Sequence, residues 1–303
     1  MTRPAVSVIV LNWNGRDDTL ACVASVLAAG HEGVDILVVD NGSTDGSAVE
    51  FDRVWADEPR VRLLRNDANL GYAGGNNTGF ADALARGARH ILVLNNDTLV
   101  EPGAIEPLVD AINADPHLAM VGPKVREMDN PERLGCSFDS IRLWCFGALP
   151  TTAGQIDRGQ FDTARDLDVI TGCAVLIRAQ ALREVGVFDT DYFAYYEEVD
   201  LAFRLKRAGW RLGFVPSSVV RHKGGASTAG RSAVVRYYKL RNMILFMRKN
   251  ARWYHFLTFA PIAALVSAQR MAVTLLRGDL AGLGALVHAL LWHFGVRRDW
   301  RPH

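Results

Sequence analysis

The hydrophobic positions of the chain fall into two kinds of run that alternate along its first hundred residues. Mostly apolar runs of strand length occupy residues 6–11, 35–39, 61–64 and 91–94, with Ser7, Asp35 and Arg62 as their polar members. Residues 17–29 instead carry apolar side chains at helical spacing. Nearly continuous apolar runs are typical of parallel strands buried on both faces, and their alternation with helices predicts right-handed crossovers. The pattern therefore predicts an α/β fold with a mostly parallel central sheet flanked by helices.

Polar side chains follow three of these predicted strands at the point where each strand ends. Asn12 follows the first strand, Asp40 the second, and Asn95, Asn96 and Asp97 the fourth. Because the carboxyl ends of parallel strands share one edge, we expect these side chains to converge where open α/β sheets bind ligands. Amides and carboxylates there can hydrogen-bond a base and a ribose, and one carboxylate can hold a metal. The structural alternative for Asp97 is an ordinary Asx turn after a strand.

A glycine-rich stretch, residues 69–79, opens a helix predicted to run to about residue 86. Glycines let backbone N–H groups approach a ligand closely, and a helix N-terminus attracts anions. The spacing is not the dinucleotide-binding Gly-x-Gly-x-x-Gly, and no Lys follows as in a P-loop. A dinucleotide oxidoreductase and a P-loop NTPase are therefore disfavoured, and an ordinary glycine-rich helix start stays open.

The second half of the chain alternates less regularly. We expect a helix over 103–114 and strands over 120–125, 169–177, 212–215 and 219–221. Residues 126–168 show no clear periodicity, and a long irregular segment within a compact domain is usually functional or mobile. We interpret it as a candidate acceptor-side loop.

Three carboxylates, Glu197, Glu198 and Asp200, begin a helix predicted to run to about residue 208. Acids in the first turn of a helix are stabilising without any function. The aromatic residues just before them would wall a cleft, however, and the helix dipole should keep these acids ionised, as a general base must be. His222 follows the last predicted strand beside Lys223 and two glycines. A lone His is usually structural, and a metal ligand or a pyrophosphate contact is the functional alternative.

Charge divides the chain more sharply than its net charge of +1 suggests. Residues 1–230 hold 22 Lys and Arg against 31 Asp and Glu, whereas residues 231–303 hold 12 against two. The basic tail also contains an apolar stretch, 253–268, that Gln269 and Arg270 interrupt before the ~20 residues of a spanning helix are complete. A second apolar stretch covers 280–296.

Basic, aromatic and interrupted apolar segments together favour helices that lie in a membrane interface, with an anionic membrane surface as the partner. A helical cap on the core or a dimer interface is the alternative. Nucleic acid is disfavoured, because the tail is too apolar and no base-reading motif occurs.

The cysteines and the N-terminus bear on the compartment. Four scattered cysteines form no Cys-x-x-Cys pair, so neither a thiolate zinc site nor a disulfide framework is expected. Free thiols in a reducing compartment fit this pattern, and the first ten residues show no secretory signal. We therefore expect a cytoplasmic protein that is peripheral on the inner face of the plasma membrane.

Taken in order, these motifs resemble those of family 2 glycosyltransferases, in particular the bacterial rhamnosyltransferase-like enzymes. The resemblance covers roughly residues 5–228 and rests on segments 6–14, 38–46, 69–77, 94–98, 196–201 and 222–225. It implies a GT-A fold over residues 1–230, with a nucleotide-binding half (1–100) and an acceptor half (101–230). Residues 231–303 would then form the helical, membrane-associating tail.

The resemblance also implies a nucleotide-diphosphate sugar donor and an inverting transfer. Asp40 would contact the nucleotide base, with Asn12 and Asn14 nearby. The Asp-x-Asp position of the family begins with Asn95 here, so binding of Mn²⁺ or Mg²⁺ rests on Asp97, with His222 as a further ligand. The expected donor-binding residues are Leu11, Asn12, Asn14, Asp40, Asn41, Asn69, Gly71, Gly74, Asn76, Asn95 and Asn96.

Glu198 occupies the position of the family's catalytic base, which is usually Asp, and Glu197 and Asp200 are its rivals. The implied activity moves a sugar, such as rhamnose from dTDP-rhamnose, or the sugar of a UDP donor, to a lipid-linked or polysaccharide acceptor in cell-envelope glycan synthesis. The departures at Asn95 and Glu198 keep a non-catalytic nucleotide-sugar-binding or scaffold subunit open. A nucleotidyltransferase on a similar sheet is a third hypothesis, and an oligomer is possible.

Overall fold

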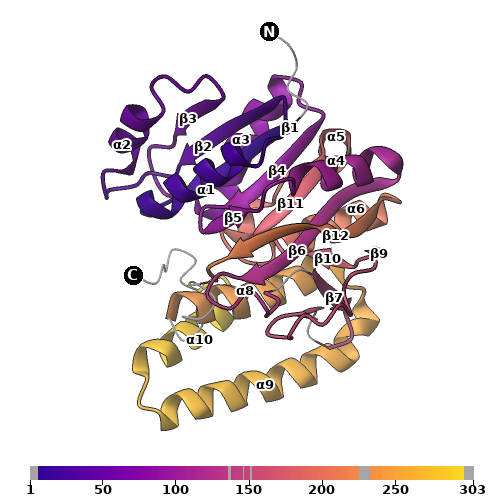
Figure 1. Cartoon of the computed structure of the whole chain (residues 1–303). Helices are drawn as coiled ribbons and strands as arrows, with labels where there is room; N and C mark the ends of the chain where they lie inside the picture. The colour runs from indigo at the N-terminus through magenta and orange to yellow at the C-terminus, as the bar shows by residue number, and fades with distance from the viewer. Residues whose placement is uncertain (1–5, 136–137, 146, 151, 225–232, 297–303) are drawn as a thin grey trace.

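The N-terminal part of the chain forms four parallel strands with helices between them (Figure 1). The computed structural model describes residues 6–135, 138–145, 147–150, 152–224 and 233–296. Its central sheet begins in the order β3-β2-β1-β4, and each neighbouring pair is parallel. In chain order the elements are β1 (Val6–Asn12), α1 (Arg16–Ala28), β2 (Val34–Asp40), α2 (Ser47–Val54), β3 (Val61–Arg65), α3 (Gly71–Ala85) and β4 (His90–Asn95). The hydrophobic pattern predicts all of them except α2.

Both faces of this part of the sheet are covered. Ile9 packs in one cluster of buried residues with Phe80 of α3. Its neighbours Val8 and Val10 pack in a second cluster with Val23 of α1. Because strand side chains alternate between faces, two covered faces require strands that are apolar at nearly every position, as in the sequence of β1, β2 and β4.

The remaining strands extend the sheet on the other side of β4 in the order β11-β6-β12-β5. β6 and β12 are parallel, whereas β11 is antiparallel to β4 and β6, and β5 is antiparallel to β12. The mostly parallel sheet thus contains three antiparallel strands, β5, β11 and the short β9. These strands are β5 (Thr98–Val100), β6 (Leu118–Glu127), β11 (Ala174–Arg178) and β12 (Arg211–His222), and β9 (Arg165–Asp166) pairs with β12.

Two predictions for this region are wrong in detail. The expected strand over 169–177 is divided into β10 (Val169–Ile170) and β11, and β10 belongs to a separate three-stranded sheet with β7 (Phe138–Arg142) and β8 (Gly147–Pro150). The expected strands 212–215 and 219–221 are one strand, β12, whose register shifts between Val215 and Val219. Pro216 lies in this shift, where a missing N–H is tolerated.

Helices α4 (Ile105–Ala114), α5 (Ala179–Val185) and α6 (Glu197–Arg207) complete the α/β part, with a short 3₁₀ turn, η1 (Thr190–Tyr192), ahead of α6. The expected helices 103–114 and 198–208 correspond to α4 and α6, and the pattern does not predict α5. The segment 126–168 holds β7, β8 and β9 in place of a wholly irregular loop. Buried Lys124 of β6 holds it by ion pairs with Asp157 (2.9 Å) and Asp162.

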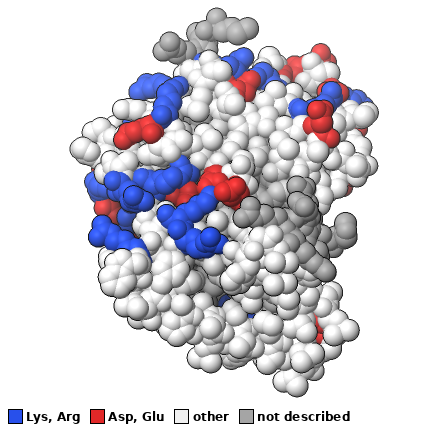
Figure 2. Space-filling model, turned by 180° about the vertical axis from the view of Figure 1, so that it is seen from behind, with Lys and Arg blue, Asp and Glu red and all other residues white. Residues whose placement is uncertain are grey.

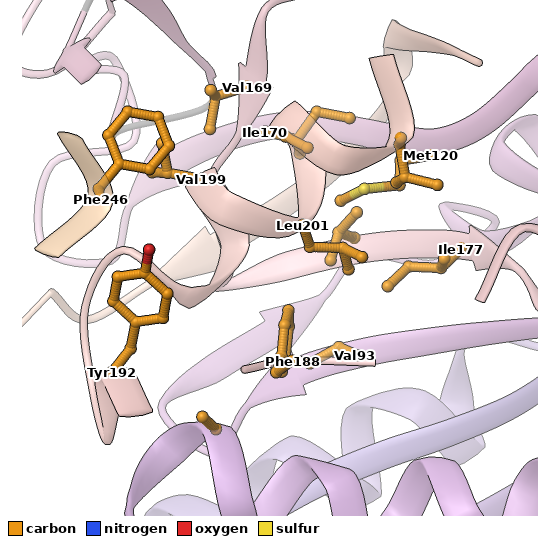
Figure 3. Close-up of a cluster of buried hydrophobic side chains, with 14 of the residues drawn as sticks. Val93, Met120, Val169, Ile170, Ile177, Phe188, Tyr192, Val199, Leu201 and Phe246 are labelled. Carbon is orange, nitrogen blue, oxygen red and sulfur yellow. The ribbon is translucent and has the colours of Figure 1, made fainter. Parts of the chain in front are cut away.

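The C-terminal helices are α8 (Ala233–Asn250), α9 (Phe256–Leu276) and α10 (Leu280–Trp292), with a 3₁₀ turn, η2 (Trp253–His255), before α9. Helix α8 is part of the core: Figure 3 shows its Phe246 beside Val199 of α6. Helix α10 packs on α8, and α9 runs along the far end of the molecule from α2 (Figure 1).

Helix α9 is longer than the interrupted apolar pattern predicts. Residues 253–276 form one helical stretch of 24 residues that contains an 18-residue window with a mean hydropathy of 1.5, long and apolar enough to cross a membrane by length and composition. The helix continues through Gln269 and Arg270, although these two polar residues interrupt its apolar run as the sequence indicates. A single such helix is weak support for a membrane location.

Candidate active site

A cavity of about 470 Å³ opens at the carboxyl edge of β1 and β4. Ten of the predicted site residues line it, from both halves of the sheet and from α6 and β12: Leu11, Asn41, Asn69, Gly71, Asn95, Asn96, Asp97, Glu197, Glu198 and His222. The other six, Asn12, Asn14, Asp40, Gly74, Asn76 and Asp200, are not among its lining residues. The predicted convergence of strand ends therefore holds for the ten lining residues. The other six lie outside the lining of the cavity.

Asn12 and Asp40 form the buried support behind the cavity. They are directly paired in the β1–β2 register, and Nδ2 of Asn12 donates to Oδ1 of Asp40 at 2.8 Å. Oδ1 of Asn12 accepts from the Thr19 hydroxyl at 2.8 Å, and the other Asp40 oxygen accepts from the Ser43 amide at 3.2 Å. Asn14 joins the same two loops by accepting from the Thr44 amide. These contacts fix the loops after β1 and β2 relative to each other.

Asn41 holds the glycine-rich loop against the sheet. Its Nδ2 donates to Oδ1 of Asn69 at 3.0 Å and to the Gly71 carbonyl at 3.1 Å, and its Oδ1 accepts from the Leu70 amide at 3.1 Å. Gly71 has a φ of 75°, and a Cβ there would lie 2.4 Å from the Phe193 carbonyl oxygen. Glycine is thus required at this position on both counts, by its backbone angle and by the approach of the chain before α6.

Gly74 and Asn76 lie inside α3 and serve its packing. A Cβ on Gly74 would meet Leu70, and Nδ2 of Asn76 donates to the Tyr72 carbonyl one turn earlier. Oδ1 of Asn76 is buried and has no hydrogen-bond partner among the described residues. Tyr72 itself does line the cavity, where its hydroxyl donates to the Gly172 carbonyl at 2.7 Å.

Asp97 and His222 meet at one wall of the cavity. Oδ1 of Asp97 lies 3.0 Å from Nε2 of His222, and Nδ2 of Asn95 lies 3.4 Å from the same nitrogen. Oδ1 of Asn95 is buried and has no hydrogen-bond partner in the part of the chain that the structure describes. The loop that follows His222 leaves the described residues at Gly225.

The side chains of this wall match the ligands that a divalent cation prefers. A carboxylate oxygen, an imidazole nitrogen and an unpaired amide oxygen form a donor set that suits Mn²⁺ or Mg²⁺. Within the described ranges, no three His, Cys, Asp or Glu side chains cluster as a complete metal site. The residues fit a cation that takes its remaining ligands from another molecule, such as a diphosphate.

Glu197 and Glu198 lie at the start of α6, and the two carboxyls interact. Glu197 is buried, and this burial, with the charge of Glu198 beside it, raises the pKa of Glu197 well above its usual range. The expectation that the helix dipole keeps all three first-turn acids ionised is therefore wrong for Glu197, because desolvation outweighs the dipole. A neutral Glu197 hydrogen-bonded to Glu198 leaves the negative charge of the pair on Glu198.

Asp200 is buried in the same first turn of α6, outside the cavity lining, and its carboxylate has several hydrogen-bond partners. Its carboxylate accepts from Nε of Arg204 at 2.8 Å, from the Tyr192 hydroxyl at 3.2 Å and from Nδ2 of Asn250 at 2.9 Å. These contacts tie α6 to η1 and to the end of α8. These hydrogen bonds indicate that Asp200 has a structural role.

Several cavity residues escape the motif-based prediction. Phe193 and Tyr195 belong to the aromatic cluster before Glu197, which the sequence indicates only as a possible cleft wall. Val234 and Tyr238 come from α8. Val234 and Tyr238 stand among apolar and basic residues of the tail, so the sequence does not indicate that α8 lines the cavity. Cys173 also lines it, and burial raises the pKa of this thiol to about 12. Cys22, Cys145 and Cys173 are free, and Cys136 lies outside the described residues.

Comparisons with known proteins agree with this geometry. Residues 7–186 match the family model described as glycosyl transferase family 2. Over 251 residues the chain is 31% identical to the N-acetylglucosaminyl-diphospho-decaprenol L-rhamnosyltransferase of Mycobacterium tuberculosis, covering 76% of this chain and 80% of that protein. It is 25% identical over 217 residues to the low-salt glycan biosynthesis hexosyltransferase Agl10 of Haloferax volcanii, covering 69% and 64%.

Two solved structures share the fold at 18% sequence identity. One is GalNAc-T7 with UDP, GalNAc and Mn²⁺, with a TM-score of 0.61 over 72% of this chain and 43% of that one. The other is the mannosyltransferase PcManGT from Pyrobaculum calidifontis with GDP-Man and Mn²⁺, with a TM-score of 0.56 over 96% and 87%. The fold is GT-A, and the chain belongs to the family 2 glycosyltransferases.

Proposed function

We propose that this glycosyltransferase moves a sugar, with rhamnose as the favoured candidate, from a nucleoside-diphosphate donor to a lipid-linked glycan, with inversion at the anomeric carbon. One observation carries the proposal: a single cavity holds the Asp97–His222 pair, the Glu197–Glu198 pair and the loops fixed by Asn41. Inverting transfer needs a base for the acceptor hydroxyl and a means of stabilising the leaving diphosphate, and this cavity offers residues for both.

Asp97 and His222 would hold a divalent cation, with the Asn95 amide oxygen beside them. When bound, this ion would neutralise the charge that develops on the departing diphosphate. Mn²⁺ and Mg²⁺ both suit this donor set, and Mn²⁺ is the ion present in the two structural neighbours. The loops that carry Asn41, Asn69 and Gly71 would then position the nucleotide.

Glu198 is our candidate for the general base. As the acceptor hydroxyl oxygen bonds to the anomeric carbon and the bond to the diphosphate breaks, the hydroxyl proton passes to the Glu198 carboxylate. Glu197 keeps its own proton and holds Glu198 by a hydrogen bond, which favours the charged form of Glu198 before transfer. Phe193, Tyr195 and Tyr238 give the cavity apolar walls that keep water from the donor.

The rhamnosyltransferase relative supports both the sugar and the acceptor class. The name of that protein describes rhamnosyl transfer to N-acetylglucosaminyl-diphospho-decaprenol. The match covers 76% of this chain. A dTDP- or UDP-sugar donor is consistent with that class of reaction. The prenyl carrier would bring the substrate from a membrane, which agrees with the apolar end of the molecule.

That apolar end is formed by α9, and we place it on the anionic inner face of the plasma membrane. Leu257, Leu265 and Leu276 are 69%, 70% and 87% exposed. Figure 2 shows few charges at this lower end of the molecule and a band of Lys and Arg above it. An apolar surface bordered by basic residues suits an anionic bilayer surface.

Thermal unfolding with nucleoside diphosphates and nucleotide sugars, with and without Mn²⁺, tests the donor site. A ligand at ~100 times its dissociation constant adds about 2.7 kcal/mol to the free energy of unfolding. We expect a Mn²⁺-dependent increase for one nucleotide, and that nucleotide's sugar should be transferred to a prenyl-diphosphate-linked N-acetylglucosamine. Donor binding without turnover would favour a non-catalytic subunit, and release of pyrophosphate from a nucleoside triphosphate would favour a nucleotidyltransferase.

A further inference from the structure

The chain just before the two glutamates has a backbone that side chains of its type rarely adopt. Phe193, Tyr195 and Tyr196 have φ values of 63°, 71° and 77°. Positive φ is uncommon for any residue with a Cβ, and for bulky residues it needs support from the surrounding structure. We call residues 192–196 the aromatic loop, and Tyr196 is the residue from which α6 starts.

The side chain of Asn242, on α8, is the main support of the aromatic loop. It is fully buried, and its Nδ2 lies 2.8 Å from the Tyr192 carbonyl oxygen, 2.7 Å from that of Ala194 and 2.7 Å from that of Tyr195. Three carbonyls of one short loop thus converge on one amide group. The NH₂ group has two N–H donors, so it pairs two of these carbonyls at a time, and the Tyr192 carbonyl also accepts from Arg241. Because unpaired buried carbonyls are costly, these contacts favour the loop conformation in which the three carbonyls converge here.

Arg241 orients the Asn242 side chain and also donates hydrogen bonds to the aromatic loop. Its Nε donates to Oδ1 of Asn242 at 2.7 Å, which orients the Asn242 amide with its NH₂ toward the loop. Its Nη2 donates to the Asp191 and Tyr192 carbonyls. The guanidinium lies 5.0 Å from the Tyr238 ring centroid and 4.8 Å from that of Trp292 on α10. The C-terminal helices therefore form the platform on which this polar pair is held.

The aromatic loop also contacts α3, in the N-terminal part of the chain. The Phe193 carbonyl accepts from the Ala73 amide of α3 at 3.0 Å, next to the glycine-rich loop. The Phe193 ring stacks on Tyr238 of α8 with centroids 5.1 Å apart. The loop thus links the glycine-rich loop to α8, and its last residue sets where Glu197 and Glu198 project into the cavity.

We propose that Asn242 and Arg241 are positioning residues of the active site. They hold the aromatic loop in its positive-φ conformation, and through it they place Glu198 beside the acceptor, without touching substrate. The C-terminal segment would then serve catalysis as well as membrane attachment. The inference rests on the proposed role of Glu198 as the base.

The test compares Asn242→Ala with Met247→Ala, a change at another fully buried residue of α8 that belongs to the apolar core. Hydrogen exchange of the amides of residues 193–198 is measured without substrate, followed by kcat for transfer and the Kd for dTDP with Mn²⁺. We expect Asn242→Ala to speed this exchange at least ~10-fold and to lower kcat on the order of 100-fold, the size of effect that misplacing a reacting group by about 1 Å has. The Kd should change less than about twofold, because other elements hold the nucleotide loops.

Met247→Ala should lower the melting temperature comparably yet leave kcat and the exchange of residues 193–198 near wild type. If both variants lose kcat in proportion to their loss of stability, the positioning role is overturned. It is also overturned if Asn242→Ala keeps its kcat and its exchange pattern. Should Asn242→Ala fail to fold, Arg241→Lys replaces it, with the same two readouts and a smaller expected loss. A wild-type chain that transfers no sugar would refute the proposed function, whereas the exchange result would still decide whether Asn242 holds the loop.

Discussion

Nε2 of His222 lies 3.0 Å from Oδ1 of Asp97, and this contact is created by the pairing of β5 with β12. In that antiparallel pair Thr98 is opposite His222, so the residue before β5 and the last residue of β12 meet at the sheet edge. The Lys223 amide also donates to the Asp97 carbonyl at 3.0 Å. The relative position of the two side chains therefore follows from the pairing of the two strands, and the proposed cation site depends on this pairing.

Removing either side chain of this pair should weaken cation binding. We expect Asp97→Ala and His222→Ala each to lower Mn²⁺ affinity in the presence of a nucleoside diphosphate by at least ~10-fold, because each removes a direct ligand. Calorimetric titration of Mn²⁺ measures this, with Asp110→Asn on exposed α4 as the control. Unchanged affinity in both variants would show that the cation, if required, is held elsewhere.

Substitution of Glu197 and of Glu198 should have different effects on kcat. Glu198→Gln removes the proton acceptor, so we expect kcat to fall by roughly 10²- to 10⁴-fold while donor binding and folding persist. Glu197→Gln keeps an amide that can still donate a hydrogen bond to Glu198, and its kcat should fall much less. Initial rates at saturating donor measure both. Near-normal turnover in Glu198→Gln, with a large loss in Glu197→Gln, would assign the base to Glu197.

The stability of the chain should depend on pH through Glu197. Its pKa is raised in the folded state by burial and by Glu198, so the folded chain binds more protons than the unfolded chain above the ordinary Glu pKa. The free energy of unfolding therefore falls as pH rises through this window, with a slope from this group of at most about 1.4 kcal/mol per pH unit.

Glu197→Gln should remove this contribution. The variant is expected to be more stable than wild type at pH 8 and close to it at pH 4.5, because a neutral amide has no proton to lose. Urea unfolding at the two pH values tests this difference, and Glu184→Gln on exposed α5 is the control. A stability difference that is the same at both pH values would contradict a neutral Glu197.

The sequence predicts that the N-terminal strand ends meet at one edge of the sheet, because this signal is local. Each predicted strand end, such as Asn95 to Asp97, follows directly from an apolar run, and parallel pairing then brings the ends together. Asp200 and Glu197 illustrate the opposite case. Their difference from Glu198 depends on which side chains of the first turn of α6 are buried and on partners such as Arg204, and the order of residues in the helix does not reveal this.

The C-terminal part of the site could not be predicted for the same reason. Asn242 and Tyr238 lie in a segment that composition alone marks as a basic, apolar tail, and their contacts with the aromatic loop are set by tertiary packing. Arg241 and Asn242 are both buried, but in the sequence they stand among other basic and polar residues of α8 and nothing distinguishes them. The division of the chain at residue 230 remains a prediction, and α8 contributes to the cavity on the N-terminal side of it.

The exposed apolar face of α9 should determine membrane binding. Deletion of residues 231–303 is a poor test, because it would remove α8 from the core. Point changes avoid this problem: Leu265 and Leu276 are largely exposed, so Gln at both positions should leave the fold intact. Burial of a leucine side chain in an apolar environment contributes about 1.5–3 kcal/mol, so we expect the double variant to lose at least ~100-fold in partition to vesicles.

Flotation with vesicles that contain phosphatidylglycerol measures the loss, and Val49→Gln on exposed α2, at the other end of the molecule (Figure 1), is the control. Raising the salt concentration should also weaken binding of the wild-type chain, because Arg252, Arg270 and Arg277 lie within or beside α9 and attract the anionic surface only within a Debye length. If the double variant floats as well as the wild type, α9 does not bind the membrane. Its apolar face would then be covered by a protein partner, and light scattering at rising concentration would show whether that partner is a second copy of the chain.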